Sequence, residues 1–236
     1  MGISPRSLAR MSGVFQLLEG VSATFGQVVV LGRLVDFNSA ATTAANLLSQ
    51  ERLFWVGLAS CLVGTVCHLV WAWLMYELLK PVDRRLAGLV LIVMVVGCAI
   101  QAVTGLFYLA PMLLLEDGSS LQAFSTDQLQ ALALSFLVLN DYSFNIYLVF
   151  FGAWCLITGT LIFHSTFLPR LLGALLCISG LGWLMFLHPP LARSLFTPYI
   201  AAASAAGELP LMLWLLIAGA NSERWRQAER AHYVRQ

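Results

Sequence analysis

Long apolar runs separated by short polar stretches dominate the sequence. A helix that crosses a bilayer needs about 20 mostly apolar residues, and six runs reach that length. They cover residues 8–32, 53–79, 86–115, 140–163, 168–188 and 197–219. The pattern therefore predicts an all-α fold, a polytopic membrane bundle of six transmembrane helices over residues 1–221, followed by a polar tail over residues 222–236.

Two polar connections carry helical signals of their own. Residues 38–50 begin with capping residues, which predicts a short interfacial helix. Ser125 and Gln128 have the spacing of a capping box. A single helix from there to residue 163 would be about 57 Å long at 1.5 Å per residue, against a bilayer core of about 30 Å. We therefore expect a break near residues 140–143, with residues 126–138 at the interface.

Composition identifies the solvent. Hydrophobic residues make up 59% of the chain and charged residues 11%, against about 25% charged in a soluble domain. So few charges cannot cover the surface of a globule, and lipid must surround much of the chain. The net charge of +1 also excludes a strongly basic nucleic-acid-binding surface.

The distribution of basic residues predicts orientation. Three of the 13 Lys and Arg residues fall on one side of the predicted bundle: Arg33, Arg52 and Arg193. The other ten lie in the N-terminus, in the turns after the second and fourth runs, and in the tail. Because cytoplasmic loops are enriched in Lys and Arg, both termini are expected in the cytoplasm.

Six polar residues interrupt the apolar runs and are candidate ligand- or ion-binding residues. A charged side chain at the bilayer centre costs at least about 2.5 kcal/mol, so each needs a physical reason. The six come from five different runs, at similar predicted depths, and Asp141 and Asn145 share a helical face. They are Glu19, His68, Gln101, Asp141, Asn145 and Glu208.

The balance of charges in this polar layer suggests its chemistry. It offers three carboxyl groups and one imidazole, with no Lys or Arg. Ionised carboxylates in low dielectric need protons or a cation to compensate them. One hypothesis is that Glu19, His68 and Glu208 form a midplane cluster that binds a proton, a cation or a cationic ligand. The alternative is that neutral carboxyl groups join helices at about 0.6 kcal/mol per hydrogen bond; His68 alone suits a satisfied core histidine.

Other features bear on packing or exclude sites. Pro210, two residues after Glu208, cannot donate to the carbonyl of Ala206. Glycines recur seven apart in the fourth and fifth runs, which predicts close helix packing. Zinc hydrolase sites usually recruit several His or His and carboxylate ligands, so we predict no metal site, and the chain contains no CxxC, P-loop or HExxH motif. No cofactor and no catalytic residue are indicated. The tail, with Trp225 and several arginines, suits contact with anionic headgroups.

Several stretches resemble a known family. They are Tyr76–Asp83 (YELLKPVD), Leu129–Leu134 (LQALAL), Leu148–Gly152 (LVFFG), Phe167–Gly173 (FLPRLLG) and Gly207–Gly219 (GELPLMLWLLIAG). From about Leu8 to Asn221 the chain resembles the DUF4386 family of uncharacterised bacterial integral membrane proteins. The resemblance implies a bacterial inner-membrane location but no activity. In that family the position of Glu208 is usually Glu, whereas those of His68 and Asn145 are often Asp.

Three functions stay open from the sequence. The first is a transporter or ligand-binding protein that works through the polar layer. The second is an accessory subunit of a larger membrane complex, or a homo-oligomer, in which the layer is structural. The third and weakest is a membrane-embedded enzyme on a lipid- or quinone-like substrate, with His68 and a carboxyl group as acid and base. The partner common to all three is the lipid bilayer.

Overall fold

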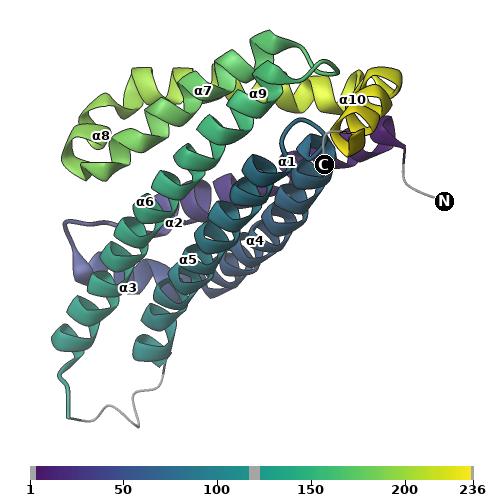
Figure 1. Ribbon diagram of the computed structural model, residues 1–236. Helices are drawn as coiled ribbons and strands as arrows, with labels where there is room; N and C mark the ends of the chain where they lie inside the picture. Colours follow the sequence, from purple (N-terminus) through teal and green to yellow (C-terminus); the bar gives the residue numbers. More distant parts are fainter. Residues whose placement is uncertain (1–3, 117–122, 235–236) are drawn as a thin grey trace. The chain divides into compact units, whose positions relative to one another are not determined.

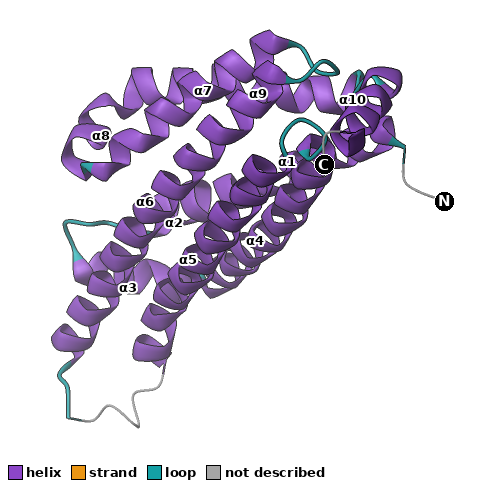
Figure 2. Cartoon of the chain, viewed as in Figure 1, coloured by secondary structure: helices purple, strands orange, loops and turns teal. Residues whose placement is uncertain are grey.

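The computed structural model describes residues 4–116 and 123–234 of the 236-residue chain. Every regular element within these residues is a helix (Figure 2). The all-α fold class is therefore confirmed.

The helices are labelled in Figure 1. In chain order they are α1 (Pro5–Ala23), a π-helical segment (Thr24–Val30), α2 (Leu31–Leu34), α3 (Ala40–Ser49), α4 (Glu51–Leu79), α5 (Arg84–Glu116), α6 (Thr126–His164), α7 (Arg170–Leu184), a 3-10 turn (Met185–Leu187), α8 (Pro189–Leu195), a second π-type segment (Phe196–Ile200), α9 (Ala201–Ile217) and α10 (Ser222–Val234).

Six helical segments of the described chain are long and apolar enough to cross a membrane, as predicted. They are Pro5–Leu34, Glu51–Leu79, Arg84–Glu116, Thr126–His164, Arg170–Leu187 and Pro189–Ile217. Large apolar side chains on them face outward: Leu187 is 72% exposed, Ile217 71% and Leu171 67%. Such exposure is favourable when the surroundings are hydrocarbon rather than water.

The sixth spanning segment contains a kink that the sequence explains. Thr197 has extended backbone angles (φ −110°, ψ 125°) between α8 and α9. The next residue is Pro198, and the residue before a proline is disfavoured in the α conformation. The predicted start of this run at residue 197 coincides with the kink, and α8 extends the segment back to Pro189.

Both capping signals are found in the structure. Ser39 caps α3, its Oγ accepting from the backbone N–H of Thr42 at 3.2 Å, so a short helix does form within residues 38–50. At the start of α6, the N–H of Ser125 donates to Gln128 Oε1 at 2.8 Å, and the N–H of Gln128 donates to Ser125 Oγ at 3.3 Å. This reciprocal pair is the predicted capping box.

The predicted break in the fourth span is wrong. α6 continues through residues 140–143 and has 39 residues, or about 58 Å at 1.5 Å per residue. Its polar side chains find partners outside α6 instead of disrupting it: Asn140 Nδ2 donates to Thr104 O at 3.0 Å, and Thr104 Oγ1 donates to Ser143 Oγ at 2.8 Å. Since these partners satisfy the side chains, the helix has no need to unwind, and its length exceeds a bilayer core of about 30 Å.

The packing of residues divides the chain into two units. Unit 1 comprises Met1–Leu18, Cys67–Cys98 and Asn145–Gln236, and unit 2 comprises Glu19–Val66 and Ala99–Phe144. Helices α1, α4, α5 and α6 each contribute one part to each unit.

Unit 2 is built on an apolar core around one buried tyrosine. The ring of Tyr108 lies 5.0 Å from that of Phe54, and its hydroxyl donates to the carbonyl of Gly26 at 3.4 Å. Tyr108 and Phe54 are fully buried, so the hydroxyl needs this acceptor. The rest of the cluster is aliphatic or sulfur-containing: Val30, Leu34, Leu47, Leu58, Cys61, Met112 and Leu137.

Unit 1 is held by close contacts between α6, α7 and α9. An ideal Cβ added to Gly152 would lie 2.9 Å from the carbonyl oxygen of Gly180, and one added to Gly159 would lie 2.7 Å from that of Gly173. The glycines of α6 and α7 therefore face each other in two pairs seven residues apart, which confirms their predicted packing role. α7 and α9 run side by side (Figure 1, green to yellow).

Candidate functional site

Glu208, near the middle of α9, accepts three hydrogen bonds on one carboxyl oxygen. Ser179 Oγ and Trp183 Nε1, both on α7, donate to its Oε1 at 2.7 Å each. Ser204 Oγ, one turn earlier on α9, donates at 2.9 Å. A carboxyl oxygen has two lone pairs and can accept several donors at once. The carboxyl group thus ties α7 to α9 and receives from side chains the donors that hydrocarbon cannot supply.

A glycine permits this close approach of α9 to α7. An ideal Cβ on Gly207 would lie 2.6 Å from the carbonyl oxygen of Leu175 and 2.7 Å from Ser179 Cβ. Both neighbours belong to α7, so any larger residue would push the two helices apart. Gly207 therefore sets the distance over which Ser179 and Trp183 reach Glu208.

The backbone of α9 at this point also contacts α1. Gln16 is buried, and its Nε2 donates to the carbonyl of Glu208 at 3.3 Å. Pro210, which offers no N–H to Ala206, lies inside α9 without ending it. The bond from Gln16 therefore joins α1 to α9 at a carbonyl other than the one that Pro210 leaves without a helical donor.

His68 lies at the centre of an aromatic cluster made by α4 and α6. Its ring is 5.0 Å from that of Trp71, 5.6 Å from that of Phe151 and 6.3 Å from that of Trp154. Tyr147 Oη and His68 Nδ1 are 3.1 Å apart and share a hydrogen bond. His68 is completely buried, so unit 1 surrounds the imidazole with rings and one hydroxyl.

Regular spacing on two helices builds this cluster. On α4, His68 and Trp71 are three residues apart; on α6, Tyr147, Phe151 and Trp154 follow at intervals of four and three. These intervals place side chains on one face of a helix. Because both aromatic faces lie in unit 1, their rings interlock, with Trp71 and Trp154 only 4.6 Å apart.

A chain of aromatic contacts joins the cluster to the carboxyl group. Trp183, which donates to Glu208, has its ring 6.0 Å from that of Phe151. Phe151 in turn contacts His68. Unit 1 therefore places His68 and Glu208 at two ends of one aromatic assembly.

Several buried polar atoms on the α4 and α6 parts of unit 1 have no hydrogen-bond partner among the described residues. They include the indole N–H groups of Trp71 and Trp154, which are 1% and 0% exposed, and the hydroxyl of Thr158, one helical turn beyond Trp154 on α6. A buried polar group left unsatisfied costs about 1–3 kcal/mol. Three such donor groups, one on α4 and two on α6, therefore remain available for a hydrogen-bonding partner from outside the described chain.

The six predicted site residues fall in both units. His68, Asn145 and Glu208 belong to unit 1, and Asn145 is buried with no partner for its Nδ2 among the described residues. Glu19, Gln101 and Asp141 belong to unit 2, where Glu19 and Gln101 are buried and Asp141 is half-buried. A cluster of Glu19 with His68 and Glu208 remains a prediction.

The side chains around His68 and Glu208 were not predicted from the sequence. Ser204, at i−4 from Glu208, had a recognisable signal, because residues four apart meet on a helix. Ser179 and Trp183 had none, since their contact depends on how α7 crosses α9. The aromatic stripe on α6 was visible as spacing but resembled ordinary core packing.

The structure, together with the comparison of the sequence with known protein families, defines the class of protein. Six long apolar helices with lipid-compatible outer faces make this a multi-span α-helical membrane protein. Residues 11–219 match the family model described as a domain of unknown function, DUF4386. The chain therefore belongs to the DUF4386 family. No curated protein and no solved structure matches it.

Proposed function

We propose that this membrane protein binds a small ligand that presents an oxygen acceptor, at the aromatic cluster around His68. Of the functions suggested by the sequence, this proposal keeps ligand binding. It restricts the binding region to the part of the polar layer that lies in unit 1. The observation that carries it is the set of buried donors around His68 that have no acceptor among the described residues.

The chemistry of these donors favours an acceptor over a cation. Indole N–H groups only donate, and the Thr158 hydroxyl can donate. A carbonyl, carboxylate or phenolic oxygen would pair with Trp71 or Trp154, whereas a bare cation would be repelled by the positive end of each N–H dipole. The rings of Phe151 and Trp154, which stack on each other 5.8 Å apart, would form an apolar wall beside the body attached to that oxygen.

A structural role for Glu208 supports a second candidate function. Its Oε1 is engaged by three donors of the chain itself, which accounts for a half-buried carboxyl group without an ion. An accessory subunit of a larger membrane complex would need polar residues of this kind only to join its own helices.

The setting of the protein forms part of the proposal. The ten basic residues grouped at the N-terminus, two turns and the tail support an orientation with both termini in the cytoplasm. Together with family membership this favours a bacterial inner membrane. Fusions of alkaline phosphatase and of a fluorescent protein to the C-terminus test the orientation: phosphatase activity without fluorescence would contradict it.

Thermal stability measurements test the ligand proposal. Purified wild-type protein, Trp71→Phe and Glu208→Gln would each be melted with short-chain quinones, fatty acids, inorganic anions and a series of cations. A ligand that binds the folded state raises Tm by mass action. We expect an oxygen-bearing compound to raise Tm in wild type and in Glu208→Gln but less in Trp71→Phe, which lacks one of the two indole donors.

Two other outcomes would contradict the proposal. A cation that stabilises wild type but not Glu208→Gln would indicate binding at the carboxyl group instead. If no compound moves the Tm of wild type, while both variants melt earlier, the polar groups are structural and the accessory-subunit function is favoured.

A further inference from the structure

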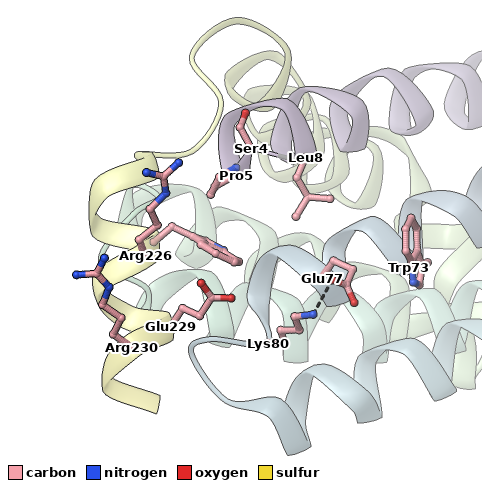
Figure 3. A pocket seen from close by; sticks show the side chains of 10 residues that line it. Ser4, Pro5, Leu8, Trp73, Glu77, Lys80, Arg226, Glu229 and Arg230 are labelled. Carbon is pink, nitrogen blue, oxygen red and sulfur yellow. Dashed lines mark hydrogen bonds and ion pairs between the residues drawn. The ribbon is translucent and has the colours of Figure 1, made fainter. Parts of the chain in front are cut away.

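A cavity of about 500 Å³ lies in unit 1 where the first turn of α1, the last turns of α4 and helix α10 come together (Figure 3). Its size is within the range of about 300–1,000 Å³ found for small-molecule sites. Its lining is distinct from the His68 cluster and from the residues that contact Glu208.

Helix α10 is fixed against the rest of unit 1, so it forms a defined wall of the cavity. Trp225 Nε1 donates to the carbonyl of Leu78 at 2.8 Å, and Arg224 donates to the carbonyl of Thr166 at 3.3 Å. Leu78 is in the last turn of α4, where carbonyls have no partner within the helix. The indole therefore caps α4 and holds α10 in place.

The cavity carries charges of both signs. Its cations are Lys80, Arg226 and Arg230, and its carboxyl groups are Glu77 and Glu229. Three positive and two negative groups give the lining a net charge of +1. Lys80 Nζ lies 2.6 Å from Glu77 Oε2, and Glu229 points from α10 toward this pair (Figure 3).

The same cavity has an apolar side that belongs to the spanning helices. Leu8 of α1 and Trp73 of α4 line it, and Trp73 is 47% exposed. Leu69, one turn before Trp73, is also exposed. Tryptophan is enriched at membrane interfaces, where its ring contacts hydrocarbon and its N–H meets the headgroup layer. The cavity thus joins a charged chamber to a lipid-exposed surface.

We infer that this cavity binds the headgroup of a zwitterionic phospholipid that carries a primary ammonium group, with the acyl chains against Trp73. Arg226 and Lys80 supply donors for the phosphate, as in other phosphate sites. Glu229 accepts from the ammonium, because Glu77 is already paired with Lys80. A purely anionic headgroup would leave Glu229 facing negative charge. A quaternary ammonium has no N–H to donate to it, so a primary ammonium fits better.

Melting experiments on the purified full-length chain test this inference. Dioctanoyl lipids that differ only in headgroup would be added: phosphatidylethanolamine, phosphatidylcholine and phosphatidylglycerol, with soluble phosphoethanolamine as a fourth probe. We expect the ethanolamine lipid to raise Tm by several degrees at saturation, and more than the other three probes do. Glu229→Gln should abolish that preference, because the ammonium loses its charged partner.

Glu223→Gln is the matched control, since Glu223 is an exposed residue of the same helix that does not line the cavity. It should keep the wild-type preference. If Glu229→Gln fails to fold, Arg226→Gln provides the second test and should weaken stabilisation by both phosphatidylethanolamine and phosphatidylglycerol.

Three results would overturn the inference. One is equal stabilisation by all three lipids in wild type. Another is an ethanolamine preference that survives in Glu229→Gln. The third is stabilisation by soluble phosphoethanolamine as large as that by the lipid, which would assign the cavity to a soluble phosphate compound.

Discussion

Two polar regions of unit 1 differ in whether the hydrogen-bonding groups of their side chains find partners within the chain. At Glu208, one carboxyl oxygen accepts hydrogen bonds from Ser179, Trp183 and Ser204, so donors and acceptor all belong to the chain. Around His68, by contrast, the N–H groups of Trp71 and Trp154 are buried and have no partner among the described residues. Both regions are linked by the contact between Trp183 and Phe151.

This difference distinguishes polar side chains that stabilise the fold from polar side chains that could bind a ligand. A buried polar network whose members satisfy one another stabilises a fold and specifies its packing. Buried donors left without acceptors lower stability, and a fold retains them at functional sites more often than elsewhere. Variants that remove the polar groups of each region in turn should therefore have opposite effects on stability.

Replacement of the central acceptor should have the largest effect. Glu208→Leu leaves the two serine hydroxyls and the Trp183 N–H without their acceptor. With hydrogen bonds in membrane proteins measured at about 0.6 kcal/mol each on average and about 1.7 at most, the loss of three should lower the free energy of unfolding by about 2–5 kcal/mol. Equilibrium unfolding of the purified protein in mixed micelles measures it.

Glu208→Gln is the control, because its amide oxygen still accepts. It should lose clearly less stability than Glu208→Leu. If both variants lose the same amount, the three hydrogen bonds seen at Oε1 contribute little and the Glu208 region does not have the structural role assigned to it.

A backbone change should disrupt the same region with a somewhat smaller effect. Gly207→Ala would place a Cβ 2.6 Å from the carbonyl oxygen of Leu175. α9 must then move away from α7, which lengthens the bonds from Ser179 and Trp183 to Glu208. Overpacking of this kind costs about 1–3 kcal/mol, measurable as a lower unfolding free energy.

Gly97→Ala is the comparison within unit 1. Its Cβ would lie 3.3 Å from Phe150 Cβ and 3.6 Å from the flexible Met94 side chain. Alanine also favours the helix over glycine by up to about 1 kcal/mol, so Gly97→Ala should be close to neutral. A Gly207→Ala variant as stable as Gly97→Ala would show that α7 and α9 do not depend on their close approach.

The membrane-spanning segments could be predicted from the sequence because each needs about 20 mostly apolar residues, a property of the local sequence. The internal structure of the fourth span could not be predicted in this way. Asn140 and its neighbours looked like a helix break, yet Thr104 satisfies Asn140 and Ser143 from another helix. The contact between Thr104 and Asn140 joins residues 36 positions apart, and no local sequence pattern predicts it.

The candidate site divides in the same way. Glu208 and His68 stood out because charge in a span is costly, whichever residues surround it. Their surroundings could not be predicted, since Ser179 meets Glu208 only through the packing of α7 on α9. Nor did the sequence indicate which polar residues would be satisfied and which would not, because that depends on side-chain positions at both helix faces.

A matched pair of small substitutions gives the sharpest test, with the smallest expected effects. Ser179→Ala removes a donor to Glu208 from a fully buried position and should lower the unfolding free energy by about 1 kcal/mol. Thr158→Val exchanges a fully buried hydroxyl that lacks a partner among the described residues for a methyl group of similar shape. It should leave stability unchanged or raise it, because no hydrogen bond is lost and one unsatisfied group is removed. Unfolding of both variants under identical conditions measures the contrast.

Should Thr158→Val instead lose as much stability as Ser179→Ala, the hydroxyl of Thr158 has a partner in the protein as purified. A bound molecule that co-purifies with wild type and is lost from Thr158→Val, detected by native mass spectrometry, would then identify that partner as a ligand.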